Sequence, residues 1–519
     1  MEPLILSIDC GTQSIRAILF TLKGNIIDKE QIVYEPYFSL KAGWAEQNAE
    51  VYWEGLCEAT NILKNRNLEN FKDIKGVGVT TLRSTMVNVD KEGNTLRPSL
   101  VWLDQRMANN VYKPNLALKL IFKALGLNAT LQKMERKGHC NWIRQNEPEI
   151  WKKTHKYLQI SGYLNYKLTG EFKDSVASQI GYIPFDYKKQ TWANPNDLLE
   201  LNSKLYPVEQ EKLPELVSPG ERVGEISKKA SALSGIPQDV PVIACGSDKG
   251  CETLGMGVTD TKTASLSFGT TATVQTTSNK YFEPISFFPA YPSVIPNHWN
   301  PEIEIYRGYW MIRWFKDEFA HKEVEEAAKK NIPAEEVMNK LLHKSPPGAM
   351  GLIIQPYWSP GLGEKNAKGA MIGFGDVHKK EHIYRAVIEG LAYGLLDGMH
   401  KLEKQGKLTF EKLAVSGGAS QSDEICQITA DVFNMPLVRG KTHETSGLGA
   451  AILTAYGVNE FSSLHKAVES MVSYADVFKP KAENTKIYSA LYKDVYLKMY
   501  KNLKPLYKKI QEITGYPEN

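Results

Sequence analysis

The 519-residue chain lacks paired cysteines, a strong charge imbalance and any long hydrophobic run. Its six cysteines form no Cys-x-x-Cys pair, which argues against a disulfide framework or zinc site and for reduced thiols. Lys and Arg outnumber Asp and Glu only by 63 to 59, too small an excess to indicate nucleic-acid binding. No apolar run approaches the ~20 residues that span a bilayer, and the first residues lack a secretory signal. We therefore expect a cytoplasmic protein that binds neither nucleic acid nor membrane.

Two short segments, one in each half of the chain, share a pattern in which a hydrophobic strand runs into a Gly-Thr turn. The first segment, residues 4–12, ends in Asp9-Cys10-Gly11-Thr12, and the second, residues 263–271, ends in Gly269-Thr270-Thr271. About one domain of chain separates them. The total length also exceeds what a single hydrophobic core usually serves. The sequence therefore predicts two related domains that begin with the same strand and turn.

The Gly-Thr turns have the composition of phosphate-binding loops. A glycine after a buried strand lets the backbone turn tightly and point N–H groups at an oxyanion, and the next threonine adds a hydroxyl donor. Gly11 with Thr12, and Gly269 with Thr270, are therefore candidate phosphate contacts. Only the first turn is preceded by a carboxylate, Asp9, which could hold Mg²⁺ against the phosphates.

Two further glycine-rich segments have an alternative interpretation. Residues 416–420 include Gly417, Gly418 and Ala419 and follow a predicted strand, so a flat adenine or ribose could approach the bare backbone. A tight turn between a strand and a helix explains the same residues. Residues 446–451 could flank a nucleotide or serve close helix packing.

Asp248 is the candidate general base. It lies in a glycine-rich segment, residues 246–250, after a predicted strand and between the two phosphate turns in the sequence. A carboxylate there could take the proton of a substrate hydroxyl as that hydroxyl attacks a γ-phosphate, which contributes roughly 10²–10⁴ in rate. An isolated Asp in such a loop is more often a turn residue, and its position between the two turns favours the catalytic interpretation.

The ordered series of motifs resembles the FGGY carbohydrate kinases, a family of two-domain, actin-like enzymes that phosphorylate sugars and polyols with ATP. The resemblance covers nearly the whole chain. The motifs that carry it are Asp9-Cys10-Gly11-Thr12, Ala45-Glu46-Gln47 with Trp53, Trp102-Leu103-Asp104-Gln105-Arg106, Trp142-Ile143-Arg144 before Glu147-Pro148-Glu149, Gly246-Ser247-Asp248, Gly369-Ala370-Met371-Ile372-Gly373 leading to Arg385-Ala386 and Glu389-Gly390, and Gly447-Leu448-Gly449-Ala450-Ala451.

The resemblance implies an α/β fold of two actin-like (ribonuclease H-like) duplicated domains with an interdomain active-site cleft. The expected boundaries are 1–245 for a sugar-binding domain, 246–480 for a nucleotide-binding domain with the catalytic Asp, and 481–519 for a solvated helical tail. ATP and Mg²⁺ are the implied cofactors, and a homodimer is implied as well. The implied roles are catalysis by Asp248, metal binding by Asp9, ATP binding by Gly11, Thr12, Gly269 and Thr270, and adenosine contact by Gly417, Gly418 and Ala419.

The expected substrate contacts include Arg83 and Ser84. Xylulose kinases of the family usually carry Met-His at this place and glycerol kinases carry Arg-Glu, so Arg83 matches the second group and Ser84 matches neither. An arginine offers a rigid fork of donors, whereas a histidine both donates and accepts. The change is therefore expected to alter which substrate oxygens are recognised.

Trp102 and Asp104 are the other expected substrate contacts. Asp104 would accept hydrogen bonds from a polyol, or would form a surface ion pair with Arg106. Trp102 and Trp44 could pack on the apolar face of a sugar, whereas Trp53 fits a hydrophobic core. 

The expected function is ATP-dependent phosphorylation of a hydroxyl of a small sugar or polyol, with a ketopentose such as xylulose favoured. The alternatives are a kinase of glycerol or of another polyol or ketose, and a non-catalytic actin-like ATP-binding protein that signals by domain movement. The sequence does not fix the sugar, the hydroxyl or the oligomeric state. Tyr309 and Trp310 could reshape a purine pocket, although filling the core is the favoured interpretation.

Overall fold

The computed structural model describes residues 2–516 apart from 115–118, 120–121, 125–126, 198–199 and 360–366. The chain divides into two compact units. The domains expected from the sequence are continuous segments with boundaries at residues 245 and 480, whereas these units combine separate segments, and the expected boundaries stay a prediction. Unit 1 comprises Met1–Gly255, Tyr291–Trp299 and Glu444–Val472, and unit 2 comprises Met256–Ala290, Asn300–His443 and Ser473–Asn519.

Unit 1 is built on a six-stranded mixed sheet with the order β13-β14-β5-β1-β2-β3. The central strand β1 pairs antiparallel with β2 and parallel with β5, and β14 runs parallel to β5 on its other side. The hydrophobic run of β1 is buried throughout, whereas β3 at the edge alternates half-buried and exposed residues. The strands are β1 (Leu4–Cys10), β2 (Ser14–Thr21), β3 (Ile26–Val33), β5 (Ile74–Thr81), β13 (Arg222–Glu225) and β14 (Pro241–Ile243).

Unit 2 repeats this sheet with the order β19-β16-β15-β22-β23-β24. Its first strand β15 pairs antiparallel with β16 and parallel with β22, and β22 runs parallel to β23. Strand order and directions match those of unit 1, so the predicted duplication is confirmed. The strands are β15 (Thr263–Phe268), β16 (Ala272–Gln275), β19 (Glu302–Ile305), β22 (Lys412–Ser416), β23 (Leu437–Gly440) and β24 (Tyr474–Phe478).

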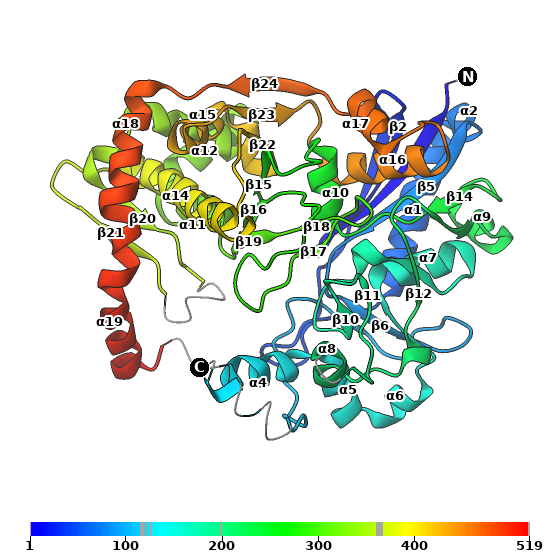
Figure 1. Ribbon diagram of the computed structural model, residues 1–519. Coiled ribbons are helices and arrows are strands. Elements are labelled where there is room, and N and C mark those ends of the chain that lie inside the picture. The colour runs from blue at the N-terminus through cyan, green and yellow to red at the C-terminus, as the bar shows by residue number, and fades with distance from the viewer. Residues whose placement is uncertain are drawn as a thin grey trace. The chain divides into compact units, whose positions relative to one another are not determined.

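The helices of unit 1 include one that comes from far along the sequence. Helix α16 (Thr445–Gly457) packs on α10 (Asp248–Gly255), β1 and β5 (Figure 1). A side chain at Gly449 would lie 1.9 Å from the carbonyl oxygen of Cys251, so the small residues of this segment serve close helix packing. The remaining helices are α1 (Glu50–Arg66), α2 (Leu68–Phe71), α4 (Asn128–Lys137), α5 (His139–Asn146), α6 (Pro148–Lys153), α7 (Ile160–Thr169), α8 (Asn202–Leu205), α9 (Lys228–Ser234) and α17 (Leu464–Met471) with the 3-10 turns η1 (Val176–Ser178) and η2 (Gln210–Lys212).

Short strands complete unit 1. A four-stranded sheet has the order β4-β7-β6-β8. Three two-stranded sheets are formed by β10 with β11, by β9 with β12 and by β17 with β18. Two hydrophobic clusters of described residues lie one on each side of the main sheet, and Trp53 belongs to the first, as expected for a core residue. The short strands are β4 (Glu46–Gln47), β6 (Met86–Val89), β7 (Ser99–Leu100), β8 (Lys156–Gln159), β9 (Lys173–Ser175), β10 (Phe185–Asp186), β11 (Thr191–Trp192), β12 (Glu215–Val217), β17 (Tyr291–Pro292) and β18 (Trp299–Asn300).

Unit 2 surrounds its sheet with helices, of which α14 (Lys380–Gly406) is buried along much of its length. The chain's last helices, expected to be solvated, bury tyrosines at residues 488, 492, 496 and 507 instead. Arg385 of α14 donates to the Tyr488 hydroxyl at 2.8 Å, so the tail is part of the core and only its outer face is solvated. The other elements are α11 (Trp310–Phe319), α12 (His321–Lys330), α13 (Ala334–Asn339), η3 (Lys340–Lys344), η4 (Ala349–Gly351), β20 (Ile353–Gln355), β21 (Ala370–Ile372), η5 (Gly418–Gln421), α15 (Asp423–Phe433), α18 (Ala482–Leu491), the π-helical turn η6 (Tyr492–Tyr496) and α19 (Leu497–Thr514).

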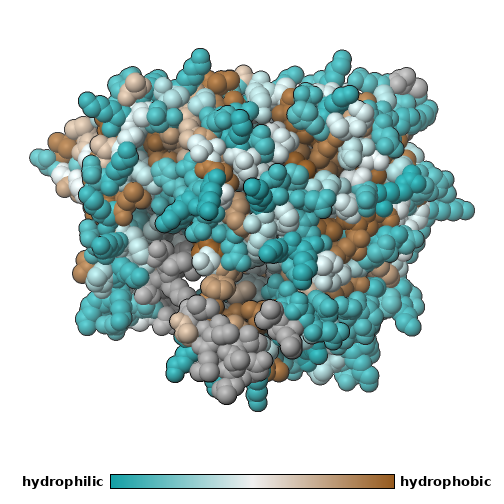
Figure 2. Space-filling model, in the orientation of Figure 1, coloured by the Kyte–Doolittle hydropathy of each residue, from teal (hydrophilic) through white to brown (hydrophobic). Residues whose placement is uncertain are grey.

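The surface in Figure 2 is mostly hydrophilic, with hydrophobic side chains in small groups between charged ones. Within the described ranges, no helix combines the length and the apolar character that a membrane crossing requires.

Candidate active site

Three neighbouring parallel strands of unit 1 carry the predicted polar residues at their carboxyl ends. Asp9 is the second-to-last residue of strand β1, Arg83 and Ser84 follow β5, and Asp248 follows β14. Because β1, β5 and β14 are adjacent and parallel, their carboxyl ends meet at one edge of the sheet. This edge is where ligands bind in open α/β sheets.

The first Gly-Thr turn closes a hairpin between β1 and β2. The Gly11 N–H donates to the Ser14 carbonyl at 2.9 Å, and the Gly11 carbonyl accepts from the Tyr34 hydroxyl at 2.7 Å. The Gly11 amide therefore holds the turn in this structure. Its role as a phosphate contact stays a prediction, as does that of the Thr12 hydroxyl.

Asp9 is buried in surroundings with several carboxylates. Arg16, its cross-strand neighbour on β2, lies 3.3 Å away, and the same arginine lies 3.7 Å from Glu444. Burial raises the pKa of Asp9 to about 7, against the lowering effect of Arg16, and the charges of Asp248 and Glu444 raise it further. A divalent cation would offset this local excess of negative charge.

The residues present fit Mg²⁺ rather than a closed metal cage. The described residues contain no group of three or more His, Cys, Asp or Glu side chains that could hold a metal ion. Mg²⁺ usually keeps several waters and takes one or two carboxylates together with substrate phosphates. A single oxygen ligand such as Asp9 beside a phosphate turn matches that chemistry.

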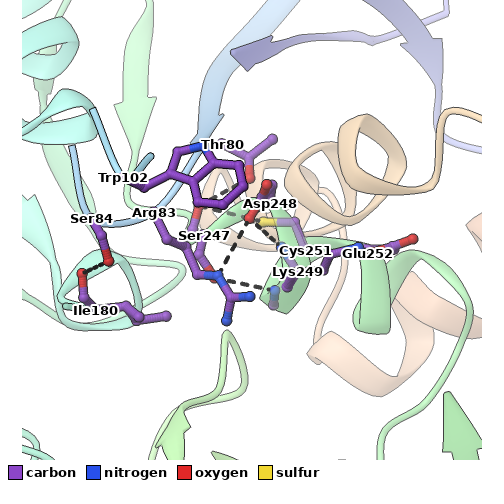
Figure 3. Close-up of polar contacts among 12 residues, drawn as sticks. Thr80, Arg83, Ser84, Trp102, Ile180, Ser247, Asp248, Lys249, Cys251 and Glu252 are labelled. Carbon is purple, nitrogen blue, oxygen red and sulfur yellow. Dashed lines mark hydrogen bonds and ion pairs between the residues drawn. The ribbon is translucent and has the colours of Figure 1, made fainter. Parts of the chain in front are cut away.

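Asp248 is the first residue of helix α10, and its side chain is 32% exposed. One carboxylate oxygen accepts from the Lys249 N–H at 2.8 Å, and the same oxygen lies 4.0 Å from the Arg83 Nε (Figure 3). Burial raises the pKa of Asp248 above its usual range, whereas Arg83 and Lys249 lower it and Glu252 raises it. A carboxylate with a raised pKa is a better proton acceptor for a hydroxyl than an ordinary surface aspartate.

Arg83 and Ser84 lie next to Asp248 but point in different directions (Figure 3). The Arg83 guanidinium reaches toward Asp248 and lies 5.4 Å from the ring centroid of Tyr291. Ser84 has a φ of 57° and donates its hydroxyl to the Ile180 carbonyl at 3.2 Å. A positive φ is uncommon for serine and often marks a functional loop.

Trp102 contacts the first Gly-Thr turn. Its indole N–H donates to the Thr12 hydroxyl at 3.1 Å, and 46% of its surface is exposed. Two predicted site residues from distant parts of the sequence are thus in contact. Trp44, by contrast, has the Arg106 guanidinium 3.8 Å from its ring centroid and the Lys41 ammonium at 4.8 Å, so it is covered by cations.

Asp104 forms the ion pair with Arg106 that the sequence offers as the alternative to a substrate contact, and the pair is buried rather than at the surface. One Asp104 oxygen lies 2.8 Å from the Arg106 Nε and the other lies 2.8 Å from the Arg106 Nη2. The Ala45 N–H also donates to Asp104 at 2.7 Å, and the Asp104 side chain is 0% exposed. A bond from Asp104 to a substrate hydroxyl therefore gains no support from this geometry.

The family-like motifs around this ion pair meet in one buried charge cluster, which was not foreseen. Arg106 also lies 3.1 Å from Glu46, which in turn lies 2.6 Å from Arg97. Arg97 continues to Glu147 at 2.6 Å, and the Trp142 ring lies 4.6 Å from the Arg106 guanidinium.

In unit 2 the second Gly-Thr turn and the third glycine cluster lie together. They follow β15 and β22, which are adjacent and parallel. Gly417 has a φ of 89°, and a Cβ there would lie 2.7 Å from the Phe268 backbone just before Gly269. Gly418, by contrast, borders open space, because a Cβ there would meet nothing within 4 Å. Their contact with a nucleotide, and that of Thr270 and Ala419, stays a prediction.

Tyr309 belongs to the core of unit 2. Its ring lies 4.3 Å from that of Phe268, and it is buried. Trp310 packs partly buried against the same core. The favoured interpretation as a core-filling residue is therefore confirmed for Tyr309, whereas Trp310 is only partly buried.

Several residues near the site belong to none of the motifs singled out from the sequence. Arg16 meets Asp9 through strand pairing, and Glu444, just before helix α16, lies near the same arginine. Thr80 donates to the Gly246 carbonyl at 3.0 Å, beside Asp248. Of these contacts, only the one between Arg16 and Asp9 could have been predicted, because the register of the β1–β2 hairpin places the two residues opposite each other.

Duplicated α/β units with carboxylates and glycine turns at their strand ends are typical of enzymes that bind a nucleotide and transfer phosphate. Comparison with known families agrees. Residues 4–255 match the N-terminal domain of the FGGY family of carbohydrate kinases, and residues 264–458 match its C-terminal domain. The chain therefore belongs to the FGGY family of carbohydrate kinases and is a sugar kinase.

Relatives match over almost their full lengths. An uncharacterised sugar kinase of Escherichia coli, YgcE, is 28% identical over 98% of this chain and 96% of its own. A xylulose kinase of Lactococcus lactis is 27% identical over 96% of both chains. A gluconokinase of Bacillus subtilis is 26% identical over 95% of this chain and 94% of its own.

Solved structures share the fold. A xylulose kinase from Lactobacillus acidophilus superposes with a TM-score of 0.81 at 20% identity, covering 98% of this chain and 100% of its own. A gluconate kinase from the same organism has a TM-score of 0.82 at 20% identity over the same shares. The expected two-domain fold is thereby confirmed, and of the two function classes considered above, the enzyme is supported.

Proposed function

We propose that the protein transfers the γ-phosphoryl group of ATP to a hydroxyl of a small sugar, with a ketopentose such as xylulose as the favoured acceptor. The observation that carries this proposal is the position of Asp248. It stands at the carboxyl end of β14, beside the ends of β5 and β1, with Arg83 4.0 Å away and a raised pKa. A partly exposed carboxylate beside a fork of hydrogen-bond donors can both meet and deprotonate a hydroxyl.

In the proposed reaction, Asp248 accepts the hydroxyl proton as the hydroxyl oxygen bonds to the γ-phosphorus. The bond from that phosphorus to the bridging oxygen breaks, and ADP leaves. The Arg83 guanidinium would orient the sugar through its oxygens, and Trp102 would offer an apolar face beside Thr12. Asp9 would hold Mg²⁺, whose charge neutralises the phosphates when it is bound.

The acceptor is supported by relatives and by one side chain. A xylulose kinase is among the relatives that match nearly the whole chain, which favours a ketopentose. Arg83 favours a second candidate, a sugar acid such as gluconate, because a guanidinium pairs with a carboxylate by two parallel bonds. Glycerol or another polyol remains the third candidate from the sequence.

The test is sugar-dependent ADP release by the full-length chain with ATP, Mg²⁺ and a panel of xylulose, gluconate and glycerol. Xylulose should give the highest kcat/KM, and a higher value for gluconate or glycerol would replace the ketopentose assignment. Asp248→Asn should lower kcat by roughly 10²–10⁴-fold. Asp239→Asn is the matched control, since this exposed aspartate sits in a turn with a φ of 64° that asparagine tolerates. Full activity of Asp248→Asn would refute the base assignment.

A homodimer also belongs to this proposal as an expectation from the family. Size-exclusion chromatography with light scattering gives the mass directly, and a mass near the 58.3 kDa of one chain would contradict it.

A further inference from the structure

The three residues before Asp248 are held by a separate segment of unit 1. The Ser175 hydroxyl donates to the Cys245 carbonyl at 2.6 Å, and the Ser247 N–H donates to the Ala177 carbonyl at 3.1 Å. The two bonds lie on either side of residue 246, so they fix the direction in which the chain enters Asp248. Residues 175–177 thus act as a clamp on the loop that carries the base.

Gly246, the middle residue of this loop, has no room for a side chain. A Cβ at Gly246 would lie 2.5 Å from the Val294 side chain and 2.9 Å from the Ala177 Cβ. On the other side, the Thr80 hydroxyl donates to the Gly246 carbonyl at 3.0 Å. The loop is therefore packed between strand β5 on one side and the clamp and Val294 on the other, so loss of the clamp would remove part of its support.

The clamp is in turn anchored by Asp174, whose carboxylate is fully buried. One oxygen accepts from the Ser161 hydroxyl and from the Gln179 side-chain amide, both at 2.7 Å. The other accepts from the Ser175 N–H at 2.8 Å and the Asn165 amide at 3.4 Å. Gln179 also donates to the Ser175 carbonyl at 3.0 Å, so Asp174 and Gln179 together hold Ser175 on both sides.

The groups that bond Asp174 are all neutral donors. Burial raises its pKa to about 7, and its hydrogen bonds with Ser161, Gln179 and the backbone oppose that rise. A buried carboxylate without a cation is costly, and a Ser or Asn would fill the same position at lower cost. Only a carboxylate, however, accepts from all of these donors at once. The buried Asp174 carboxylate therefore holds Ser175 in a fixed position rather than adding to the stability of the fold.

We infer that Asp174 and Ser175 are positioning residues for catalysis, which set the place of the Asp248 carboxylate through the clamp on residues 245–247. The inference rests on the proposed role of Asp248 as the base. Neither residue touches the reacting atoms. Because a displacement of about 1 Å at a reacting group can cost about 10²-fold in rate, loss of the clamp should lower kcat and leave substrate binding in place.

The decisive variant is Ser175→Ala, which hardly changes the side-chain volume. It removes the bond to Cys245 and also the bond of 3.2 Å that the Ser175 hydroxyl accepts from the Ala177 N–H within the clamp. We expect kcat to fall at least tenfold, with KM for ATP and for the sugar within twofold of the wild type. Ser234→Ala is the matched control, because Ser234 is also buried in unit 1 and donates to a backbone carbonyl at 2.8 Å, but at the end of helix α9. Its kcat should equal that of the wild type.

Asp174→Asn is the second variant, because it replaces one acceptor oxygen by an amide that cannot accept. It should show the same split between kcat and KM if it folds, as judged by its circular dichroism and thermal unfolding. A kcat of Ser175→Ala within twofold of Ser234→Ala would overturn the inference, and so would an increase in KM without a loss in kcat. Failure of the base assignment is seen separately, since Asp248→Asn would then remain active while Ser175→Ala is judged on its own.

Discussion

Replacing Arg106 by methionine tests how much the buried charge cluster contributes to the stability of unit 1. The Arg106 side chain is 2% exposed. Its Nε donates to one Asp104 oxygen at 2.8 Å, its Nη2 lies 2.8 Å from the other as an ion pair, and its Nη1 donates to Glu46 at 3.1 Å. Its guanidinium also lies close to the rings of Trp44 and Trp142, at 3.8 and 4.6 Å from their centroids. Methionine keeps the length and the apolar stem but leaves the carboxylates without this partner.

The expected loss follows from burial. Removing one partner of a buried ion pair typically costs about 3–5 kcal/mol, because the other charge stays desolvated and unpaired. Here the unpaired groups would be Asp104, at 0% side-chain exposure, and Glu46, at 5%, although Glu46 keeps Arg97. For a large domain each kcal/mol shifts the melting temperature by about 2–4 °C, so a decrease of about 6–20 °C is expected.

Arg66 provides a matched control with the same bonding pattern at the surface. It binds Asp28 through two bonds, at 2.9 and 3.1 Å, and Glu30 through one, but its side chain is 44% exposed. Exposed ion pairs contribute about 0.2–1 kcal/mol, so Arg66→Met should shift the urea midpoint little. Urea unfolding of both variants, followed by circular dichroism and by tryptophan fluorescence, makes the comparison. Equal losses for Arg106→Met and Arg66→Met would refute the reasoning from burial.

Three further predictions concern the site. Trp102→Phe, which loses the indole N–H bond to the first phosphate turn, should lower kcat/KM by up to about tenfold at unchanged stability, measured by steady-state kinetics and thermal unfolding. Gly417→Ala, with its φ of 89° and a Cβ contact of 2.7 Å, should destabilise the protein by more than about 1 kcal/mol, whereas Gly418→Ala should keep stability and weaken ADP binding in calorimetry. Because the pKa of Asp248 is raised and the base acts when deprotonated, the acid limb of kcat/KM should lie above the usual aspartate range and move to higher pH in Arg83→Met; a limb near pH 4 in both proteins would contradict this.

The duplicated sheets could be predicted because their signal is local. A hydrophobic strand that ends in a Gly-Thr turn occurs twice, and both copies form the same hairpin on the first strand of a six-stranded sheet. The assignment of residues 291–299 and 444–472 to unit 1 could not be predicted in this way. Their membership depends on packing between segments about 200 residues apart, such as Gly449 against Cys251, and no periodicity in either segment records that contact.

The positions of site residues that follow strands could be predicted from the sequence. The hydrogen bonds and ion pairs of individual side chains could not. Asp9, Arg83 and Asp248 could be placed because the ends of parallel strands meet. Asp104 was expected to face a sugar, but the nearby Ala45 N–H and Arg106 occupy its oxygens. A carboxylate two residues before an arginine fits either outcome, and only the burial of Asp104 and Arg106 in the folded chain distinguishes them.

In the proposed mechanism, the position of Arg83 would link sugar recognition to the strength of the base. Its guanidinium lowers the pKa of Asp248 against the effect of burial, much as Arg16 does for Asp9. A residue that differs at this place among xylulose and glycerol kinases therefore acts on two properties at once in the proposed mechanism. Replacing the arginine to suit another sugar would also raise the pKa of Asp248 and reduce the fraction of active base below neutral pH. Acceptor preference and pH dependence should accordingly change together whenever Arg83 changes, and a variant that altered one alone would show that the 4.0 Å approach of the two side chains has no part in catalysis.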